Sequence, residues 1–228
     1  NVSKITKLTL TDDPTFVGNE VGGIAGGVGN NIQINSVGYQ PNSFYVYKQV
    51  YDTNGKPVEG LYEDLDGNGT INTNDKYRYK NPEPRFFFGF SNNLSYKDWS
   101  LGFVARANLG NYVYNNFNSY SGTFNTFSNS AGFLNNGSAN YLQTGFKNSQ
   151  YFSDYYVENA SFFRMDNISL GYNLGEVEDG VNIRLSAFVN NVFIITNYSG
   201  LDPEIAGGID KNLYPRPRTF SLAVNIDF

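Results

Sequence analysis

The sequence predicts an all-β protein whose strands are of the kind that builds an antiparallel transmembrane β-barrel. Three observations predict this fold class. Several segments alternate apolar and polar residues with period two, which indicates strands with one apolar face. Aromatic residues make up 17% of the 228 residues and occur beside 24 Gly and 33 Asn, a composition typical of strands joined by turns. Short and long connections alternate along the chain, as they do between the two ends of membrane barrels.

The last ten residues show the alternation most clearly. In 219–228 every even position is apolar and every odd position is small or polar. A tilted strand of about ten residues is long enough to cross a bilayer. In a barrel, Phe220, Leu222, Val224 and Ile226 would therefore face lipid. A half-buried strand of a soluble sandwich would show the same pattern, so this segment does not separate the two folds.

Other segments repeat the pattern and divide the chain. Their polar positions hold Ser, Gly, Asn and isolated Arg rather than Lys and Glu, as in the crowded, wet lumen of a barrel. Two of these lumen-type positions, Arg106 and Arg184, would contact a solute or plug, or pair with another lumen group. The segment 3–10 is weaker because Lys4 and Lys7 interrupt it. The predicted barrel strands lie near 3–10, 86–96, 99–109, 162–174, 182–193 and 219–228.

The connections set the expected topology. Residues 97–98 form a minimal turn and 175–181 a short one, whereas 11–85, 110–160 and 194–218 are long. Counting strands back from Phe228 places both short connections on the periplasmic side, which makes 11–85 a long extracellular loop region. Five or six strands are fewer than the roughly eight of the smallest common membrane barrel, so 1–228 is expected to be part of a larger barrel. Closure by several identical chains is the alternative.

Composition excludes several classes of function. The chain has neither His nor Cys, so a Ser-His or Cys-His nucleophile and the ordinary zinc, haem and iron–sulfur sites are excluded. With 16 Lys and Arg against 21 Asp and Glu, the net charge of −5 does not suit a nucleic-acid partner. Carboxylate clusters at 12–13 and 176–179 lie in turns rather than in a defined cleft, so glycosidase chemistry is disfavoured. We therefore expect no enzyme.

One acidic loop has the spacing of a calcium site. Counted from Asp64, oxygen-bearing residues fall at positions 1, 3, 5, 7, 9 and 12, and Gly69 holds position 6. Calcium is bound by six to eight oxygens supplied from such positions, so calcium is the expected cofactor. The alternative is a metal-free turn held by its own side chains. The predicted ligands are Asp64, Asp66, Asn68, Thr70, Asn72 and Asp75.

Several blocks in order resemble the C-terminal barrel of SusC/RagA-type TonB-dependent outer-membrane transporters. Their order and spacing match over most of 62–228, whereas 1–61 shows no close match. The blocks are YEDLDGNGTI at 62–71, YKDWSL at 96–101, ASFFRMDNISLGY at 160–172, NVF at 191–193, YSGLDPE at 198–204 and YPRPRTF at 214–220.

The resemblance implies a 22-stranded barrel with long extracellular loops in the cell outer membrane, embedded in outer-membrane lipid. Such a protein imports oligosaccharides or peptides, is driven by TonB through a plug, and is capped by a SusD-like surface lipoprotein. The plug, the TonB box and a signal peptide are missing from this chain, so residues for energy coupling cannot be assigned here. By the same resemblance, Phe228 on its alternating strand would be read by the barrel-assembly machinery; otherwise it is simply the last apolar residue.

Two other functions fit parts of the sequence. A secreted, soluble β-sandwich that binds glycans would explain the calcium loop and an aromatic surface, and a β-rich surface structural protein would explain the composition. Aromatic residues of 112–127, among them Tyr120 and Phe124, could stack on sugar rings, although packing within the loop is the favoured role. The lumen-type polar faces and the alternating connection lengths favour the barrel. Substrate-binding residues are not assigned by the sequence.

Overall fold

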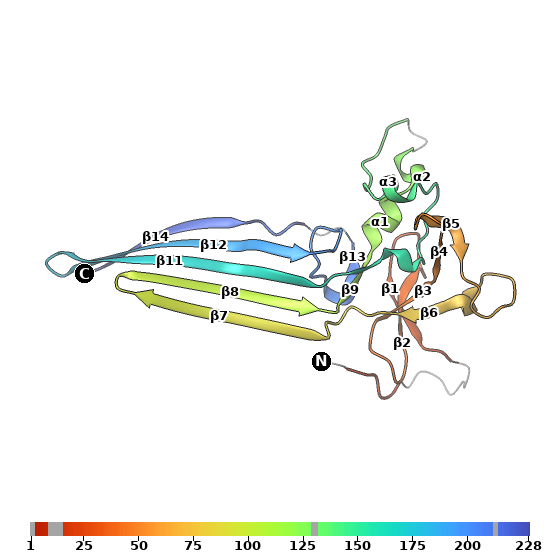
Figure 1. Ribbon diagram of the computed structural model, residues 1–228, viewed down its shortest axis with the longest axis horizontal. Coiled ribbons are helices and arrows are strands. Elements are labelled where there is room, and N and C mark those ends of the chain that lie inside the picture. Colours follow the sequence, from red (N-terminus) through yellow and green to blue (C-terminus); the bar gives the residue numbers. More distant parts are fainter. Residues whose placement is uncertain (1–2, 9–15, 129–131, 212–213) are drawn as a thin grey trace. The chain divides into compact units, whose positions relative to one another are not determined.

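The structure is a computed structural model that describes residues 3–8, 16–128, 132–211 and 214–228. The chain divides into two compact units, each built from segments distant in sequence (Figure 1). Unit 1 comprises 1–83, 111–160 and 198–213, and unit 2 comprises 84–110, 161–197 and 214–228.

Unit 2 is one antiparallel sheet of five strands in the order β14-β12-β11-β8-β7. Its strands are long and twist together as a ribbon (Figure 1). Their bounds are β7 Phe86–Tyr96, β8 Trp99–Leu109, β11 Phe162–Glu178, β12 Val181–Thr196 and β14 Thr219–Asp227.

These strands coincide with five predicted ones, although β11 and β12 extend further toward each other than expected. Lys97 and Asp98 form the tight turn between β7 and β8, where Lys97 has a φ of 53°. The connection between β11 and β12 shrinks from the predicted 175–181 to Asp179 and Gly180. Both turns and Phe228 lie at the same end of the sheet, as the counting of strands predicted (Figure 1).

The described residues of unit 1 form three small sheets. Their strands are short, with β-branched and aromatic residues that favour extended backbone, as in NIQIN and SFYVY. The sheets have the orders β1-β2-β3-β6, β4-β5 and β10-β9-β13, and within the last only β13 and β9 run parallel. The bounds are β1 Asn19–Gly23, β2 Asn31–Asn35, β3 Ser43–Tyr47, β4 Gln49–Tyr51, β5 Pro57–Tyr62, β6 Lys76–Tyr79, β9 Tyr112–Asn115, β10 Val157–Asn159 and β13 Ile209–Asp210.

Helices in the described residues are short and lie in unit 1. The α-helices are α1 Asn116–Ser121, α2 Phe124–Phe127 and α3 Tyr141–Thr144, and the 3₁₀ helices are η1 Thr73–Asp75, η2 Asp154–Tyr156 and η3 Ala206–Gly208. Asn115 caps α1 by accepting the Asn118 backbone N–H. Within the part of the chain that the structure describes, no helix is long and apolar enough to cross a membrane.

A hydrophobic core holds unit 1 together. Tyr114 from β9 and Tyr156 from η2 are fully enclosed, with their rings edge to face at 6.3 Å. Ile32, Phe44 and Val46 from β2 and β3 complete the centre with no more than 2% of their surface exposed. Burial of aromatic and branched side chains stabilises these short strands, which would not persist alone.

Two predictions about the first 85 residues need correction. The expected strand at 3–10 is absent in its described part: residues 3–8 are not a strand, and Ile5 instead exchanges two backbone hydrogen bonds with the turn at Gly38 and Tyr39. Positions 9–10 lie outside the described residues. The region 11–85 is no simple loop, because 16–83 contributes six strands and much of the unit 1 core.

Candidate functional site: a two-faced sheet and a carboxylate loop

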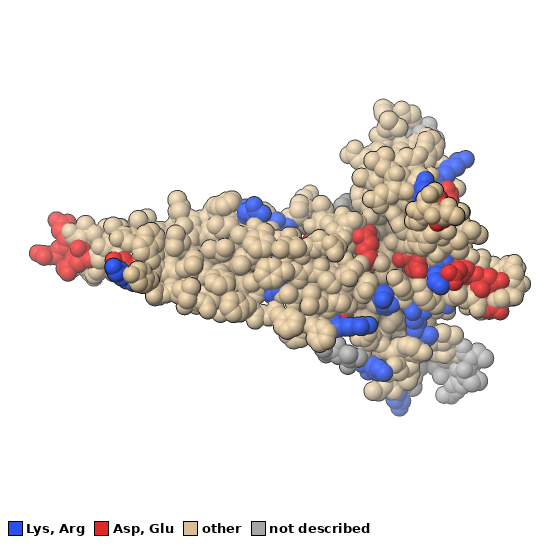
Figure 2. Space-filling view, in the orientation of Figure 1, with Lys and Arg blue, Asp and Glu red and all other residues tan. Residues whose placement is uncertain are grey.

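The sheet of unit 2 has one continuous apolar face. Residues paired directly across antiparallel strands point to the same side, so the register defines the faces. One row runs from Leu94 through Leu101, Leu170 and Ala187 to Leu222. This face is open to the surroundings: Phe220 keeps 75% and Leu222 86% of its surface. Figure 2 shows few charged groups along these strands and an acidic group at the turn between β11 and β12.

The opposite face of the sheet is polar and tightly spaced. Gly102 lies between polar side chains of its neighbours, such that a Cβ there would come within 2.6 Å of Ser169 Oγ and 2.8 Å of Asn93 Oδ1. Gly171 is similarly close to Ser100 Oγ. Small residues therefore let polar groups of adjacent strands meet over this face.

A β-bulge in β11 keeps the two faces continuous. The register with β8 shifts between Met165 and Asn167, so Asp166 has no partner in the ladder. The shift returns Met165 and Phe163 to the apolar face, where the Phe163 and Phe193 rings lie 6.1 Å apart.

The bulge also turns Asp166 toward Arg106. The guanidinium makes a two-pronged contact, with Arg106 Nε donating to Asp166 Oδ2 at 2.7 Å and Nη2 to Oδ1 at 3.2 Å. Of the two roles predicted for Arg106, the structure therefore shows pairing with another group of the polar face. Sequence reasoning missed Asp166 because the bulge interrupts the period-two alternation at a single residue, which the pattern does not distinguish from an ordinary irregularity.

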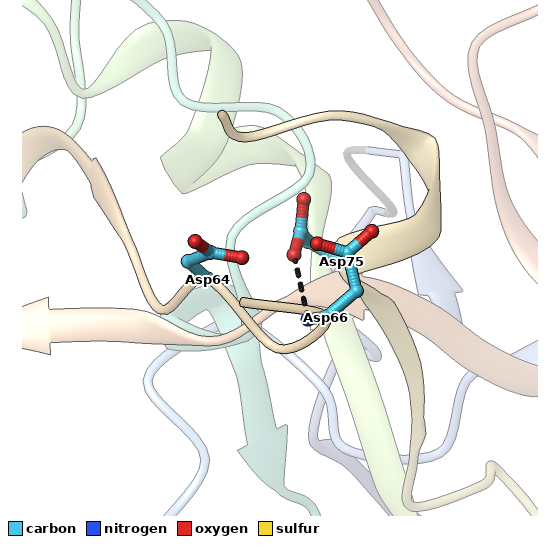
Figure 3. A group of neighbouring side chains, drawn as sticks. All are labelled: Asp64, Asp66 and Asp75. Carbon is cyan, nitrogen blue, oxygen red and sulfur yellow. Dashed lines mark hydrogen bonds between the residues drawn. The ribbon is translucent and has the colours of Figure 1, made fainter. Parts of the chain in front are cut away.

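The loop from Asp64 to Asp75 brings three of the six predicted calcium ligands together. Carboxylate oxygens of Asp64, Asp66 and Asp75 lie within 4.8 Å of one another (Figure 3). Asp64 and Asp66 are exposed, whereas Asp75 is fully buried. Oxygens this close repel one another when ionised, which a cation or hydrogen-bond donors can offset.

The buried carboxylate of Asp75 stabilises the loop by accepting hydrogen bonds from its backbone. Its Oδ1 accepts the Leu65 backbone N–H at 2.8 Å and its Oδ2 accepts that of Asn72 at 2.8 Å. These backbone hydrogen bonds, that of Asn72 foremost, hold the pKa of the Asp75 carboxyl below its ordinary value of 3.8. The buried carboxylate is therefore ionised at neutral pH, and its hydrogen bonds connect Leu65 and Asn72 to η1.

Asp64, at the start of the loop, likewise accepts two backbone hydrogen bonds. Its two oxygens accept the backbone N–H groups of Gly67 at 2.8 Å and Gly69 at 2.7 Å. The two glycines have φ of 72° and 81°, a conformation that side chains rarely adopt, so the tight turn requires them.

The other three predicted ligands serve the turn itself. Asn68 Oδ1 accepts the Thr70 N–H at 2.8 Å, and the Asn72 carboxamide accepts from Asn74 N and donates to the Thr70 carbonyl at 3.0 Å. Asn72 is thereby the N-cap of η1. Ile71, between these residues, keeps 39% of its surface exposed.

The aromatic residues after β8 divide by burial. Tyr114 belongs to the core, as the packing role predicted. Tyr120 and Phe124 instead expose 49% and 48% of their surface. The Phe127 ring packs edge to face on Tyr141 at 5.1 Å.

A long antiparallel sheet with a continuous apolar face, a polar face of small residues and short turns at one end has the architecture of a membrane-barrel wall. Comparison with known proteins specifies its type. Over its whole length the chain is 45% identical to the TonB-dependent receptor SusC of Bacteroides thetaiotaomicron, of which it spans 23%. It is 30% identical over 83% of its length to the TonB-dependent receptor P3 of Formosa agariphila, of which it spans 21%. No protein-family model matches.

Solved structures agree with this assignment. A structure of the RagAB peptide transporter superposes with a TM-score of 0.67 at 25% identity, covering 88% of the chain and 24% of that protein. The RagAB peptide importer in its closed-closed state matches in fold, with a TM-score of 0.69 over 99% of the chain and 26% of that protein at 24% identity. The sequence and fold are those of a segment of a SusC/RagA-type TonB-dependent receptor. The chain spans about a quarter of the length of the proteins it matches.

Proposed function

We propose that the chain is part of an outer-membrane TonB-dependent importer of oligosaccharides or peptides, in which unit 2 forms barrel wall and unit 1 lies outside the cell. The apolar face of unit 2 carries this proposal. Exposure of Phe220, Leu222 and Val224 is favourable in lipid, whereas an exposed apolar patch of this extent is unfavourable in water.

The same face disfavours the secreted β-sandwich. A sandwich needs a second sheet that packs about 10 Å from the first and interdigitates with its apolar side chains. Unit 2 consists of a single sheet among the described residues, and its apolar side chains remain exposed.

The two edges of the sheet support a larger barrel. Along the described chain, β14 pairs only with β12 and β7 only with β8, so each edge strand has one side without a ladder. Unpaired backbone groups are costly in lipid and require further strands on both sides. From the resemblance to SusC/RagA-type transporters, we infer that the complete, closed barrel has 22 strands.

The partners proposed for the whole receptor follow from the same resemblance. They are a SusD-like surface lipoprotein over the extracellular side, TonB acting through a plug region, the barrel-assembly machinery acting on β14, and outer-membrane lipid. We propose no catalytic residue, because the relatives are named as receptors and transporters.

Extraction of the full-length receptor tests the location. We expect it in the outer-membrane fraction, resistant to high salt and alkaline carbonate and released only by detergent, because its apolar face requires an amphipathic surrounding. Recovery as a stable monomer in detergent-free buffer would contradict the barrel and favour the sandwich.

We further propose that the loop at 64–75 binds one calcium ion on the extracellular side. Asp64, Asp66 and Asp75 would supply carboxylate oxygens, and Asn68, Thr70 and Asn72 the remaining oxygens, with the Asn72 side chain turning from its capping role. Oxygen donors without nitrogen or sulfur suit a hard cation, and a flexible polar shell favours calcium over magnesium. The ion would brace the loop beside the entrance for solute, where the lipoprotein would dock.

Terbium luminescence and calorimetry on the full-length receptor test this site. We expect one calcium to bind, and Asp66→Asn to weaken binding by about tenfold, or roughly 1.4 kcal/mol. Asp52→Asn is the matched control, since Asp52 also holds a tight turn through Asn54 and Lys56 but lies outside the cluster. Absence of binding at millimolar calcium, or equal affinity in Asp66→Asn, would contradict the proposal.

A further inference from the structure

A long stretch of the chain, most of it in unit 1, carries no charged residue. From Ala107 to Phe146 the sequence contains no Asp, Glu, Lys or Arg, but many Asn, Ser, Thr and Tyr. The described part of this stretch includes β9 and all three α-helices. Figure 2 shows a largely uncharged surface over α1–α3 on the face drawn.

A hollow of about 550 Å³ opens in this surface. Its volume lies within the range of about 300–1,000 Å³ that is usual for small-molecule sites. Hydroxyl and carboxamide side chains line it, and no charged residue is among the described residues that do so. Its lining includes Tyr120, Asn125, Thr126, Asn148, Ser149 and Tyr151.

Hydrogen bonds among the lining residues, and from Glu59 behind them, hold the walls of the hollow. Asn125 Nδ2 donates to Asn148 Oδ1 at 2.8 Å and joins the two sides. Behind them, Glu59 accepts the backbone N–H groups of Lys147 and Asn148, each at 2.8 Å. Thr126 Oγ1 donates to the Tyr120 carbonyl at 2.8 Å, which fixes the end of α1 against α2. The hollow is thus preorganised, which lowers the entropic cost of binding.

Several polar groups of the hollow are available to a ligand. The hydroxyls of Tyr120, Tyr151 and Ser149 and the Asn125 Oδ1 make no hydrogen bond to protein within the residues that the structure describes. The Tyr120 ring, with 49% of the residue's surface exposed, adds a flat apolar face. The hollow therefore combines donors, acceptors and a ring face with no fixed charge.

We propose that this hollow is a binding subsite for an uncharged saccharide. A sugar ring presents hydroxyls that both donate and accept, and C–H faces that stack on an aromatic ring. A peptide terminus or an acidic sugar would instead need a charged partner, because a charge desolvated against neutral groups is costly. The inference rests on the proposed importer and selects oligosaccharides from its two substrate classes.

Saturation-transfer NMR on the full-length receptor tests the subsite in a detergent without a sugar headgroup. The probes are maltohexaose and cellohexaose as neutral saccharides, trigalacturonic acid as a charged one, and a hexapeptide. We expect a neutral hexasaccharide to bind and Tyr120→Ala to weaken it by about five- to tenfold through loss of stacking. Tyr120→Phe should retain most of the affinity. Tyr51→Ala is the matched control, because Tyr51 in β4 is 47% exposed and lies outside the hollow.

The outcomes separate this inference from the proposed importer. Equal saccharide affinity in Tyr120→Ala and the native receptor would overturn the subsite, as would binding of only the peptide or the acidic sugar in a manner sensitive to Tyr120. Failure to bind either neutral saccharide would overturn it as well. None of these results changes the extraction behaviour, whereas release of the receptor without detergent would overturn the importer itself.

Discussion

Replacing Leu222 with arginine is expected to block most of the receptor's assembly into the membrane. Leu222 lies near the middle of β14 on the apolar face, opposite Ala187 of β12. A cationic side chain facing lipid near the bilayer midplane costs about 2–4 kcal/mol. The measurement is the fraction of full-length receptor that migrates as a folded, protease-resistant barrel in outer membranes.

The neighbouring position provides the control. Ser221 is opposite Phe188 on the polar face, so an arginine there extends toward the lumen and not into lipid. We expect Ser221→Arg to assemble close to native levels. Equal loss, or equal tolerance, in Leu222→Arg and Ser221→Arg would show that the faces are assigned wrongly.

Truncation of Phe44 to alanine is expected to loosen unit 1 while leaving the sheet of unit 2 assembled. Phe44 in β3 is fully buried between Ile32, Val46 and the tyrosines of the core. Removing a buried phenylalanine costs about 3–5 kcal/mol through lost burial and the cavity left behind. Hydrogen exchange of the full-length receptor measures the effect: amides of β2 and β3 should exchange much faster, and those of β8 and β11 as before.

Phe133→Ala is the control for this variant, because Phe133 is 74% exposed. We expect its exchange in β2 and β3 to match the native receptor. Unchanged exchange in Phe44→Ala would mean that the region before β7 behaves as the loop that the sequence suggested, without a core of its own.

The sheet of unit 2 could be predicted from the sequence because its strands are long enough for period two to emerge. Residues 99–109 and 219–228 carry five or more alternations each, and both faces follow from them. The β11 bulge could not be predicted, because skipping Asp166 breaks the period locally without changing composition. The pairing of Arg106 with Asp166 depends on that bulge and therefore could not be predicted either.

Most of the strands and strand pairings of unit 1 could not be predicted from the sequence. Its strands have six residues or fewer, too few for a period, and β9 pairs with β10 and β13, which are distant in sequence. Spacing in the acidic loop did predict that Asp64, Asp66 and Asp75 converge. It did not predict that Asp75 would be buried and would accept the backbone N–H groups of Leu65 and Asn72, because the same spacing suits both a ligand and a hydrogen-bond acceptor.

Cysteine labelling along β14 tests most directly whether unit 2 is barrel wall, because it shows for each residue whether the side chain faces water or lipid. The native chain has no cysteine, so single substitutions at positions 220 to 225 can each be probed with a water-soluble maleimide in a full-length receptor free of other cysteines. Lumen-facing positions 221, 223 and 225 should react, whereas 220, 222 and 224 should be shielded by lipid and react only after detergent extraction. Uniform labelling of all six positions in intact membranes would contradict the assignment of unit 2 as barrel wall.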